Sequence, residues 1–253
     1  YYLIFSKRCK QRPAMRALMG IIFLEVTILL KLIYFKMRAL AEAPQMLMHC
    51  NNIEYEYLMS WEHFADHWSK VKPNLAFKQL PMLEVEGGHQ IFQSIAILKF
   101  LESRAGLSIS DPIQEAKANA ILQSAQELFA PLNPTVNFAV DDDFLSKRDA
   151  MRPMLANRFQ ELSNCLAENG SKFFTDDKPR AAEFATFHHL DLSKKLDDSL
   201  IKQFPRLERL VDDMMCLQGM SEYLLRRPTL IGVGKDPKLV IGGIEHSTGV
   251  EQT

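Results

Sequence analysis

The sequence predicts two domains, an α+β domain with a mixed sheet of four strands and an all-helical domain after it. Short β-branched or alternating segments, separated by helical stretches, fill the region 26–105. A glycine pair, Gly87-Gly88, follows one of these segments and indicates a hairpin turn. From Asp111 onward only helical patterns occur, and they continue to Pro228.

The composition is compatible with this size and excludes some partners. The chain has 253 residues, of which 47% are hydrophobic, enough for the cores of two domains. The formal net charge is -1, and basic residues are scattered along the sequence. A basic surface for nucleic acid or for an anionic membrane is therefore not expected.

The first elements follow from hydrophobic pattern. Residues 26–35 are rich in β-branched and aromatic side chains and predict a buried strand with an uncertain start. Residues 37–50 have helical composition, and Pro44 predicts a kink or a late start of that helix. Residues 54–58 alternate as a second strand, and a polar segment with aromatic residues follows from 60 to 78.

The next elements complete the sheet. A strand is predicted around Leu83 and Val85, and residues 90–92 return after the glycine pair. Ser94 then begins a helix that runs to about Arg104, with Ser94 as its predicted cap. The predicted order of the first domain, 26–105, is β-α-β-(α)-β-β-α.

The second domain, 111–228, opens with Asp111 as a cap and Pro112 at the first helical position. Helices are predicted at about 112–131, 146–168, 181–198 and 205–226, with loops at 131–134, at 169–170 and at Pro205. The tail 229–253 holds five glycines and one proline, so we expect it to be extended or mobile.

The first 25 residues have the composition of a leader or of a non-native extension. Basic residues precede an apolar run from 17 to 30, which is typical of a signal or anchor segment. Glu25 and Lys31 interrupt this run, whereas a membrane helix needs about 20 mostly apolar residues. A transmembrane span is therefore disfavoured.

The cysteines predict neither a disulfide scaffold nor a metal site. Four are present, far apart and without a C-x-x-C pair or a nearby histidine cluster: Cys9, Cys50, Cys165 and Cys216. Free thiols in a reducing compartment are the simplest interpretation.

Three short segments, in this order, carry a resemblance to a known family: KLIYF at 31–35, QLPML at 79–83 and QSIAI at 93–97. Between about Lys31 and Pro228 the sequence resembles the soluble glutathione transferases, in particular their sigma class. The resemblance implies a thioredoxin-like first domain, glutathione as co-substrate, no metal and a homodimer. It also implies a cytoplasmic detoxification enzyme that conjugates glutathione to small hydrophobic electrophiles.

Gln93 and Ser94 stand at a predicted helix start, where unpaired N–H groups and the helix dipole favour an anion. The resemblance implies that this anion is the γ-glutamyl carboxylate of glutathione. From the residues alone, Ser94 could also simply cap its helix.

Pro81 cannot donate a backbone hydrogen bond, so the pairing of Leu80 has to be found elsewhere. The resemblance implies a cis Leu80–Pro81 bond, with the Leu80 backbone pairing with the cysteinyl part of glutathione. A trans proline at a strand start is the alternative that the residues leave open.

Tyr34 ends the first strand and is the predicted catalytic residue. A free thiol has a pKa near 8.5, and a neutral phenol can donate a hydrogen bond that favours its thiolate. The resemblance implies this role for Tyr34 and places Phe35 beside glutathione and the electrophile. The alternative is a tyrosine that only packs at the end of a strand.

Trp68 and Lys72 lie four residues apart in the polar segment, and both offer donors to a carboxylate. The resemblance implies that they bind the glycyl carboxylate of glutathione together with Gln79. Packing against the domain is the alternative role of Trp68.

Two departures from the family bear on activity. Leu40 stands where the family often has an arginine near the sulfur, and Arg38 lies two residues earlier. The stretch from Arg180 to Glu183 lacks the Ser/Thr of a complete capping box. A weakly active or non-catalytic binding protein of this fold is therefore one alternative, and a glutathione-dependent prostaglandin-type isomerase is another.

Overall fold

A mixed sheet in the order β2-β1-β3-β4 forms the base of the first domain in the computed structural model, which describes residues 30–168 and 170–251. β1 pairs parallel with β2 and antiparallel with β3, and β3 pairs antiparallel with β4. This is the thioredoxin-like domain that the sequence predicts, and the predicted order of elements is confirmed. The strands are β1 Leu30–Tyr34, β2 Tyr55–Met59, β3 Met82–Val85 and β4 His89–Phe92.

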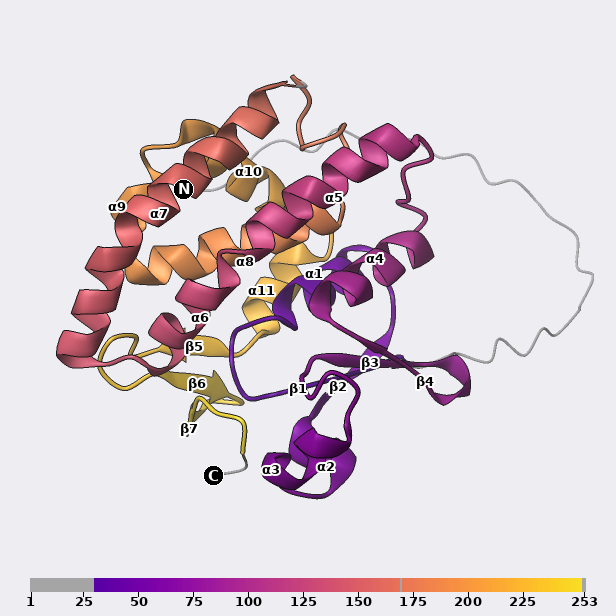
Figure 1. The fold of residues 1–253 in the computed structure, drawn as a ribbon, viewed down its shortest axis with the longest axis vertical. Helices are drawn as coiled ribbons and strands as arrows, with labels where there is room; N and C mark the ends of the chain where they lie inside the picture. Colours follow the sequence, from indigo (N-terminus) through magenta and orange to yellow (C-terminus); the bar gives the residue numbers. More distant parts are fainter. Residues whose placement is uncertain (1–29, 169, 252–253) are drawn as a thin grey trace, which may run out of the picture.

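Two helices, α1 (Glu42–Cys50) and α4 (Ser94–Arg104), lie between this sheet and the helical domain (Figure 1). α1 starts late, as Pro44 predicts, because a proline in the first turn has no donor to lose there. Ile97, Leu98 and Leu101 of α4 are buried. The sheet is therefore covered by apolar side chains on the face toward the second domain.

The connection between β2 and β3 lies on the opposite side of the sheet (Figure 1). It contains α2 (Ser60–Phe64), α3 (Trp68–Val71) and the 3-10 turn η1 (Lys72–Asn74). A second 3-10 turn, η2 (Glu86–Gly88), joins β3 to β4 at the predicted hairpin. These short turns place Trp68 against Phe35, the residue that follows β1.

The second domain is helical, as predicted, but its boundaries differ. The helix predicted at 112–131 ends at Gln126, and a further helix occupies 129–138, where the sequence predicts a loop. Its first proline, Pro131, lies in the first turn, where no intrahelical donor is needed. The helices are α5 Pro112–Gln126, α6 Phe129–Phe138, α7 Asp141–Glu168, α8 Ala181–Leu196, α9 Asp198–Ile201, α10 Pro205–Met215 and α11 Met220–Arg226.

The predicted helix at 205–226 is two helices because Gly219 separates them. Gly219 has φ +81°, and a Cβ there would lie 2.5 Å from the backbone oxygen of His49. The chain therefore turns where α10 and α11 pass close to the end of α1, and only glycine fits.

The start of α8 retains half of a capping box. The Glu183 carboxylate accepts hydrogen bonds from the backbone N–H groups of Arg180 and Phe174. An arginine side chain has no acceptor, so the reciprocal half cannot form. Glu102 of α4 instead accepts from the Ala181 N–H at 2.9 Å, which satisfies the helix start from the first domain.

The tail, expected to be extended or mobile, contains a second, antiparallel sheet beside α6 (Figure 1). Its strands are β5 Thr229–Ile231, β6 Lys238–Ile241 and β7 Ile244–Ser247. The pair Gly242-Gly243, with φ of +58° and +83°, closes a two-residue hairpin between Ile241 and Ile244. The glycines that predicted mobility thus serve the turns of a sheet.

The predictions for residues 1–25 lie outside the described residues. Within 30–168 and 170–251, no helix combines the length and hydropathy needed to cross a membrane.

Candidate functional site

The sheet register brings three predicted site residues to one edge. Ile33 of β1 pairs with Met82 of β3, and Met82 pairs with Phe92 of β4. Next to these paired residues lie Tyr34 at the end of β1, Pro81 just before β3 and Gln93 just after β4. Because these strands alternate in direction, all three residues leave the sheet at the same end. This edge is the candidate site.

Gln93 enters α4 with an unusual backbone. Its φ is +71°, a region that a residue with a Cβ rarely adopts. Such strain is often retained where a site requires it. The Gln93 amide lies 3.5 Å from the side-chain oxygen of Gln79, so two predicted site residues meet here.

Ser94 is the first residue inside α4, not its cap. Gln93 holds the cap position, and it makes no side-chain capping bond. Ser94 is buried, with 7% of its surface exposed. The predicted capping role of Ser94 is therefore wrong, because the chain enters the helix one residue earlier.

The Leu80–Pro81 peptide bond is cis, as the resemblance implies. β3 starts at Met82, so Leu80 lies beyond the ladder that pairs β3 with β1. Both Leu80 and Pro81 are buried. The Leu80 backbone therefore takes no part in the pairing of β3 with β1.

Tyr34 is almost fully buried, with 3% exposure. Burial raises the pKa of its phenol well above the usual value, and the backbone N–H of Leu40 offsets this in part by hydrogen bonding to the phenol oxygen. The phenol is therefore neutral at physiological pH and keeps its own proton for donation. The Leu40 backbone beside this phenol is a feature that sequence reasoning missed.

Aromatic rings connect Tyr34 to Trp68. The Tyr34 and Phe35 ring centroids are 5.2 Å apart, and the Phe35 and Trp68 rings form a T-shaped pair with centroids 4.9 Å apart. Trp68 is half-buried, which agrees with both its predicted binding role and its packing alternative. Lys72 is exposed one turn further along, at the start of η1.

Arg38 does not take the place of the missing arginine. It is 3% exposed, and its guanidinium donates to Glu42 and to Asp191 of α8, both at 2.7 Å. Arg227 contacts the same two carboxylates, and Tyr223 donates to Glu42 at 3.0 Å. The positive charge of Arg38 is thus paired with carboxylates at the interface between the domains.

The end of the tail lies against the candidate site. Lys36, two residues after Tyr34, exchanges two backbone hydrogen bonds with Gly249, of 3.2 and 3.0 Å. The Glu251 carboxylate lies 3.2 Å from the Trp68 backbone nitrogen. The short apolar run Leu239–Ile241, followed by the pair Gly242-Gly243, was the signal for this ordered tail.

The tail also contacts the turn between α6 and α7. Leu128, just before α6, is fully buried in the core, and Phe129, the first residue of α6, is half-buried. Val140, at the turn between α6 and α7, pairs with Gly234 of the tail.

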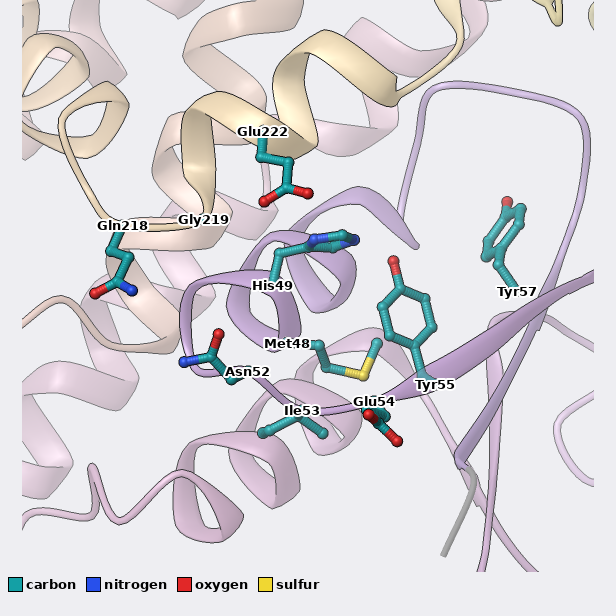
Figure 2. Close-up of a pocket in the computed structure, with 10 residues that line it drawn as sticks. All are labelled: Met48, His49, Asn52, Ile53, Glu54, Tyr55, Tyr57, Gln218, Gly219 and Glu222. Carbon is teal, nitrogen blue, oxygen red and sulfur yellow. The ribbon is translucent and has the colours of Figure 1, made fainter. Parts of the chain in front are cut away.

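A separate pocket of about 700 Å³ lies between the end of α1, the start of β2 and α11 (Figure 2). His49, Tyr55 and Glu222 point into it from these three elements (Figure 2). None of the nine predicted site residues lines it. It is therefore distinct from the candidate site.

The histidines, cysteines and acidic residues of the described part of the chain form no metal-ligand cluster. That part contains no group of three or more His, Cys, Asp or Glu residues suited to hold a metal ion. Cys50, Cys165 and Cys216 are free. Burial raises the pKa of Cys50 to about 12, which keeps its thiol protonated.

Family comparison identifies both domains. Residues 30–103 match the model described as "Glutathione S-transferase, N-terminal domain". Residues 133–227 match the model described as "Glutathione S-transferase, C-terminal domain".

Individual relatives cover the same region. Hematopoietic prostaglandin D synthase of Gallus gallus is 31% identical over 78% of this chain and 96% of its own length. Glutathione S-transferase 1 of Ascaris suum is 24% identical over the same shares. The solved structure of the Pi-class glutathione S-transferase of Onchocerca volvulus superposes with a TM-score of 0.67 at 25% identity, over 78% of this chain and 92% of that one.

Proposed function

Since the chain belongs to the glutathione S-transferase family, we propose that it conjugates the glutathione thiolate to small hydrophobic electrophiles, with Tyr34 stabilising the thiolate. The chain is a glutathione transferase, and glutathione is its co-substrate. The observation that carries the proposed mechanism is the common edge formed by Tyr34, Pro81 and Gln93. The sigma class remains a prediction.

The γ-glutamyl end of glutathione is proposed to bind at the start of α4. This helix has 11 residues, so its first N–H groups carry a substantial positive partial charge. Gln93 and Ser94 stand at that point, and Gln93 is held in a strained conformation that orients it. A carboxylate there would accept several hydrogen bonds.

The middle of the tripeptide is proposed to extend along Leu80 toward Tyr34. Leu80 lies outside the ladder, so its backbone is available to pair with the cysteinyl residue of glutathione. The sulfur would then reach the end of β1. The Gln79 side-chain oxygen lies 3.5 Å from the Gln93 amide. Trp68, Lys72 and Gln79 are proposed to bind the glycyl end.

Tyr34 is proposed to donate its phenolic hydrogen to the sulfur. Burial keeps this phenol neutral, so it retains the hydrogen that it would donate. Lowering a thiol pKa by about two units requires roughly 2.7 kcal/mol of preference for the thiolate. A hydrogen bond to a charged group supplies about 1.5–3 kcal/mol, so one phenol can account for most of it.

A weakly active binding protein is the second candidate function. It is favoured by Leu40, which replaces a positive charge near the sulfur, and by Arg38, which is held by Glu42 and Asp191. A prostaglandin-type isomerase is a third, favoured by the 31% identity to the Gallus gallus prostaglandin D synthase. All three share the glutathione site and differ in the chemistry performed once glutathione is bound.

The assembly and location also belong to this proposal. We expect a cytoplasmic homodimer that acts in detoxification, on the strength of the family alone. Sedimentation analysis of the purified chain tests the dimer, and a single species of monomer mass would contradict it.

Binding to immobilised glutathione and turnover of a chromogenic halo-aromatic test the main proposal. The full chain should be retained and active, and Tyr34→Phe should be retained but slowed about 10- to 100-fold. Tyr55→Phe is the matched control, because its hydroxyl bonds to Gln45 at 3.2 Å on another element. Absence of both retention and turnover in the full chain would refute the proposal. Retention without turnover would favour the binding protein.

A further inference from the structure

The last described residues cross from the helical domain to the candidate site. The Thr248 hydroxyl donates to the backbone oxygen of Asn137, at the end of α6, at 2.6 Å. The next residue, Gly249, forms the two backbone hydrogen bonds with Lys36 after β1. Residues 248–251, here called the strap, therefore connect α6 to the segment that follows Tyr34.

The strap ends in a carboxylate placed beside Trp68. Glu251 Oε2 accepts from the Trp68 backbone N–H and lies 3.2 Å from His67 Nδ1. The Glu251 side chain is 34% exposed, so it is partly withdrawn from water. A carboxylate from a residue 183 positions away thus lies at the residue proposed to receive the glycyl carboxylate of glutathione.

Two carboxylates cannot occupy this place together. At a separation of about 4 Å, two like charges repel by roughly 1–4 kcal/mol, depending on their exposure. Glu251 already accepts from the backbone N–H of Trp68, so a second carboxylate at this residue would have only the indole N–H of Trp68 as a donor. A tripeptide thiol must therefore displace Glu251 or bind with its glycyl end misplaced.

We propose that Glu251 determines thiol selectivity, holding the place of the glycyl carboxylate so that the chain discriminates against glutathione relative to γ-glutamylcysteine. This role for Glu251 rests on the proposed function, because it uses the proposed direction of the tripeptide. γ-Glutamylcysteine lacks the glycine, so its terminal carboxylate is that of the cysteine, one residue short of Trp68, and it leaves Glu251 in place. Glutathione can place its glycyl carboxylate at Trp68 only if the Glu251 side chain moves away.

The strap can yield without loss of the tail sheet. Gly234 accepts a 2.8 Å hydrogen bond from the Asp141 N–H, and Phe144 packs against Gly234. These contacts lie before β6, far along the chain from Glu251. Release of the last residues therefore leaves β5 to β7 anchored to α7.

Calorimetric titration of the full chain with glutathione and with γ-glutamylcysteine tests this role. Glu251→Ala should lower the Kd for glutathione about threefold to fivefold and leave the Kd for γ-glutamylcysteine unchanged. Glu245→Ala is the charge-matched control, since Glu245 is exposed in β7 and pairs with Lys238 at 3.3 Å. It should change neither Kd.

The outcomes separate this inference from the proposed function. If both thiols bind and Glu251→Ala changes neither Kd, or changes both equally, the selectivity role is refuted and the function stands. If neither variant nor the full chain binds either thiol, both are refuted. Binding of glutathione that appears only in Glu251→Ala supports both.

Discussion

The guanidinium of Arg38 lies 2.7 Å from the carboxylate of Asp191, across the boundary between the two domains. Arg38 follows β1, and Asp191 lies in α8. Glu42 and Arg227 complete a group of two positive and two negative side chains, with Arg227 3.2 Å from Glu42 and 2.9 Å from Asp191. The segment that carries Tyr34 is thereby tied to the core of the helical domain.

Removing one charge from this group should destabilise the whole chain. In Asp191→Asn two guanidinium groups lose a shared partner inside the protein, which costs about 3–5 kcal/mol for a buried pair. Burial would raise the pKa of Asp191, but Arg227 and Arg38 hold it below the usual value. Urea denaturation followed by circular dichroism measures the loss.

Asp66→Asn is the control for this prediction. Asp66 pairs with Lys70 at 3.1 Å on the surface, and surface pairs contribute little. Its denaturation midpoint should match that of the wild type. If the denaturation midpoint of Asp191→Asn were also the same as that of the wild type, this charged group would not be holding the two domains together.

Acid should destabilise the protein through two buried histidines of α8. Burial lowers the pKa of His188 to about 3, with Arg38 adding to the effect, and burial also lowers the pKa of His189. The unfolded chain binds these protons near pH 6.5 and the folded chain does not. Their contribution is therefore complete above about pH 6.5 and falls below it, by up to roughly 1.4 kcal/mol per pH unit for each histidine.

His188→Asn should remove about half of this slope between pH 6 and pH 4.5, measured by denaturation at several pH values. Burial raises the pKa of Glu183 to about 7, so Glu183 makes the folded state more stable as the pH falls, opposite to the histidines. The test is therefore the difference between the pH dependence of His188→Asn and that of the wild type. His89→Asn, at an exposed position in β4, is the control. An unaltered slope in His188→Asn would contradict the prediction.

Gln93→Gly should stabilise the fold and weaken glutathione binding at the same time. Glycine relieves the positive φ, which is worth about 0.5–1 kcal/mol net of its greater freedom when unfolded. Loss of the amide should raise the Kd for glutathione about threefold to tenfold. Denaturation and calorimetry measure the two effects.

Asn52→Gly is the matched control for Gln93→Gly, because Asn52 has φ +53° after α1 and is not a proposed site residue. It should gain stability without any change in Kd. Equal Kd values in Gln93→Gly and the wild type would remove Gln93 from the site.

Leu40→Arg should restore a positive charge near the sulfur. Leu40 is half-buried, and its backbone already contacts the Tyr34 phenol. We expect the pKa of the bound thiol to fall by about 0.5–1 unit and turnover to rise several-fold. Absorbance titration of the thiolate measures the shift, with Leu145→Arg at an exposed position of α7 as control. A thiol pKa unaffected by Leu40→Arg would contradict this.

Local pattern predicts most of the fold. Alternation and turn residues locate the four strands of the first sheet, and Pro44 correctly predicts the late start of α1. Local pattern fails at α6, because its prolines predict a loop. Pro131 lies in the first turn of this helix, where its missing N–H costs no hydrogen bond. Local pattern also fails in the tail, where the glycines outweighed the hairpin pattern around Gly242-Gly243.

Contacts between residues far apart in the chain could not be predicted from the sequence. Arg38 meets Asp191 across 153 positions, and His67 meets Glu251 across 184. Nothing in either local segment indicates its partner. The edge formed by Tyr34, Pro81 and Gln93 depends likewise on strand register, which only pairing fixes.

The pKa of the glutathione thiol bound to the full chain, and to Tyr34→Phe, tests the central claim most directly. It is measured by thiolate absorbance titration, with Tyr55→Phe as control. We predict a pKa about two units below that of the free thiol in the full chain and in Tyr55→Phe. In Tyr34→Phe it should return to near 8.5. The same lowered pKa in Tyr34→Phe would contradict the role of Tyr34.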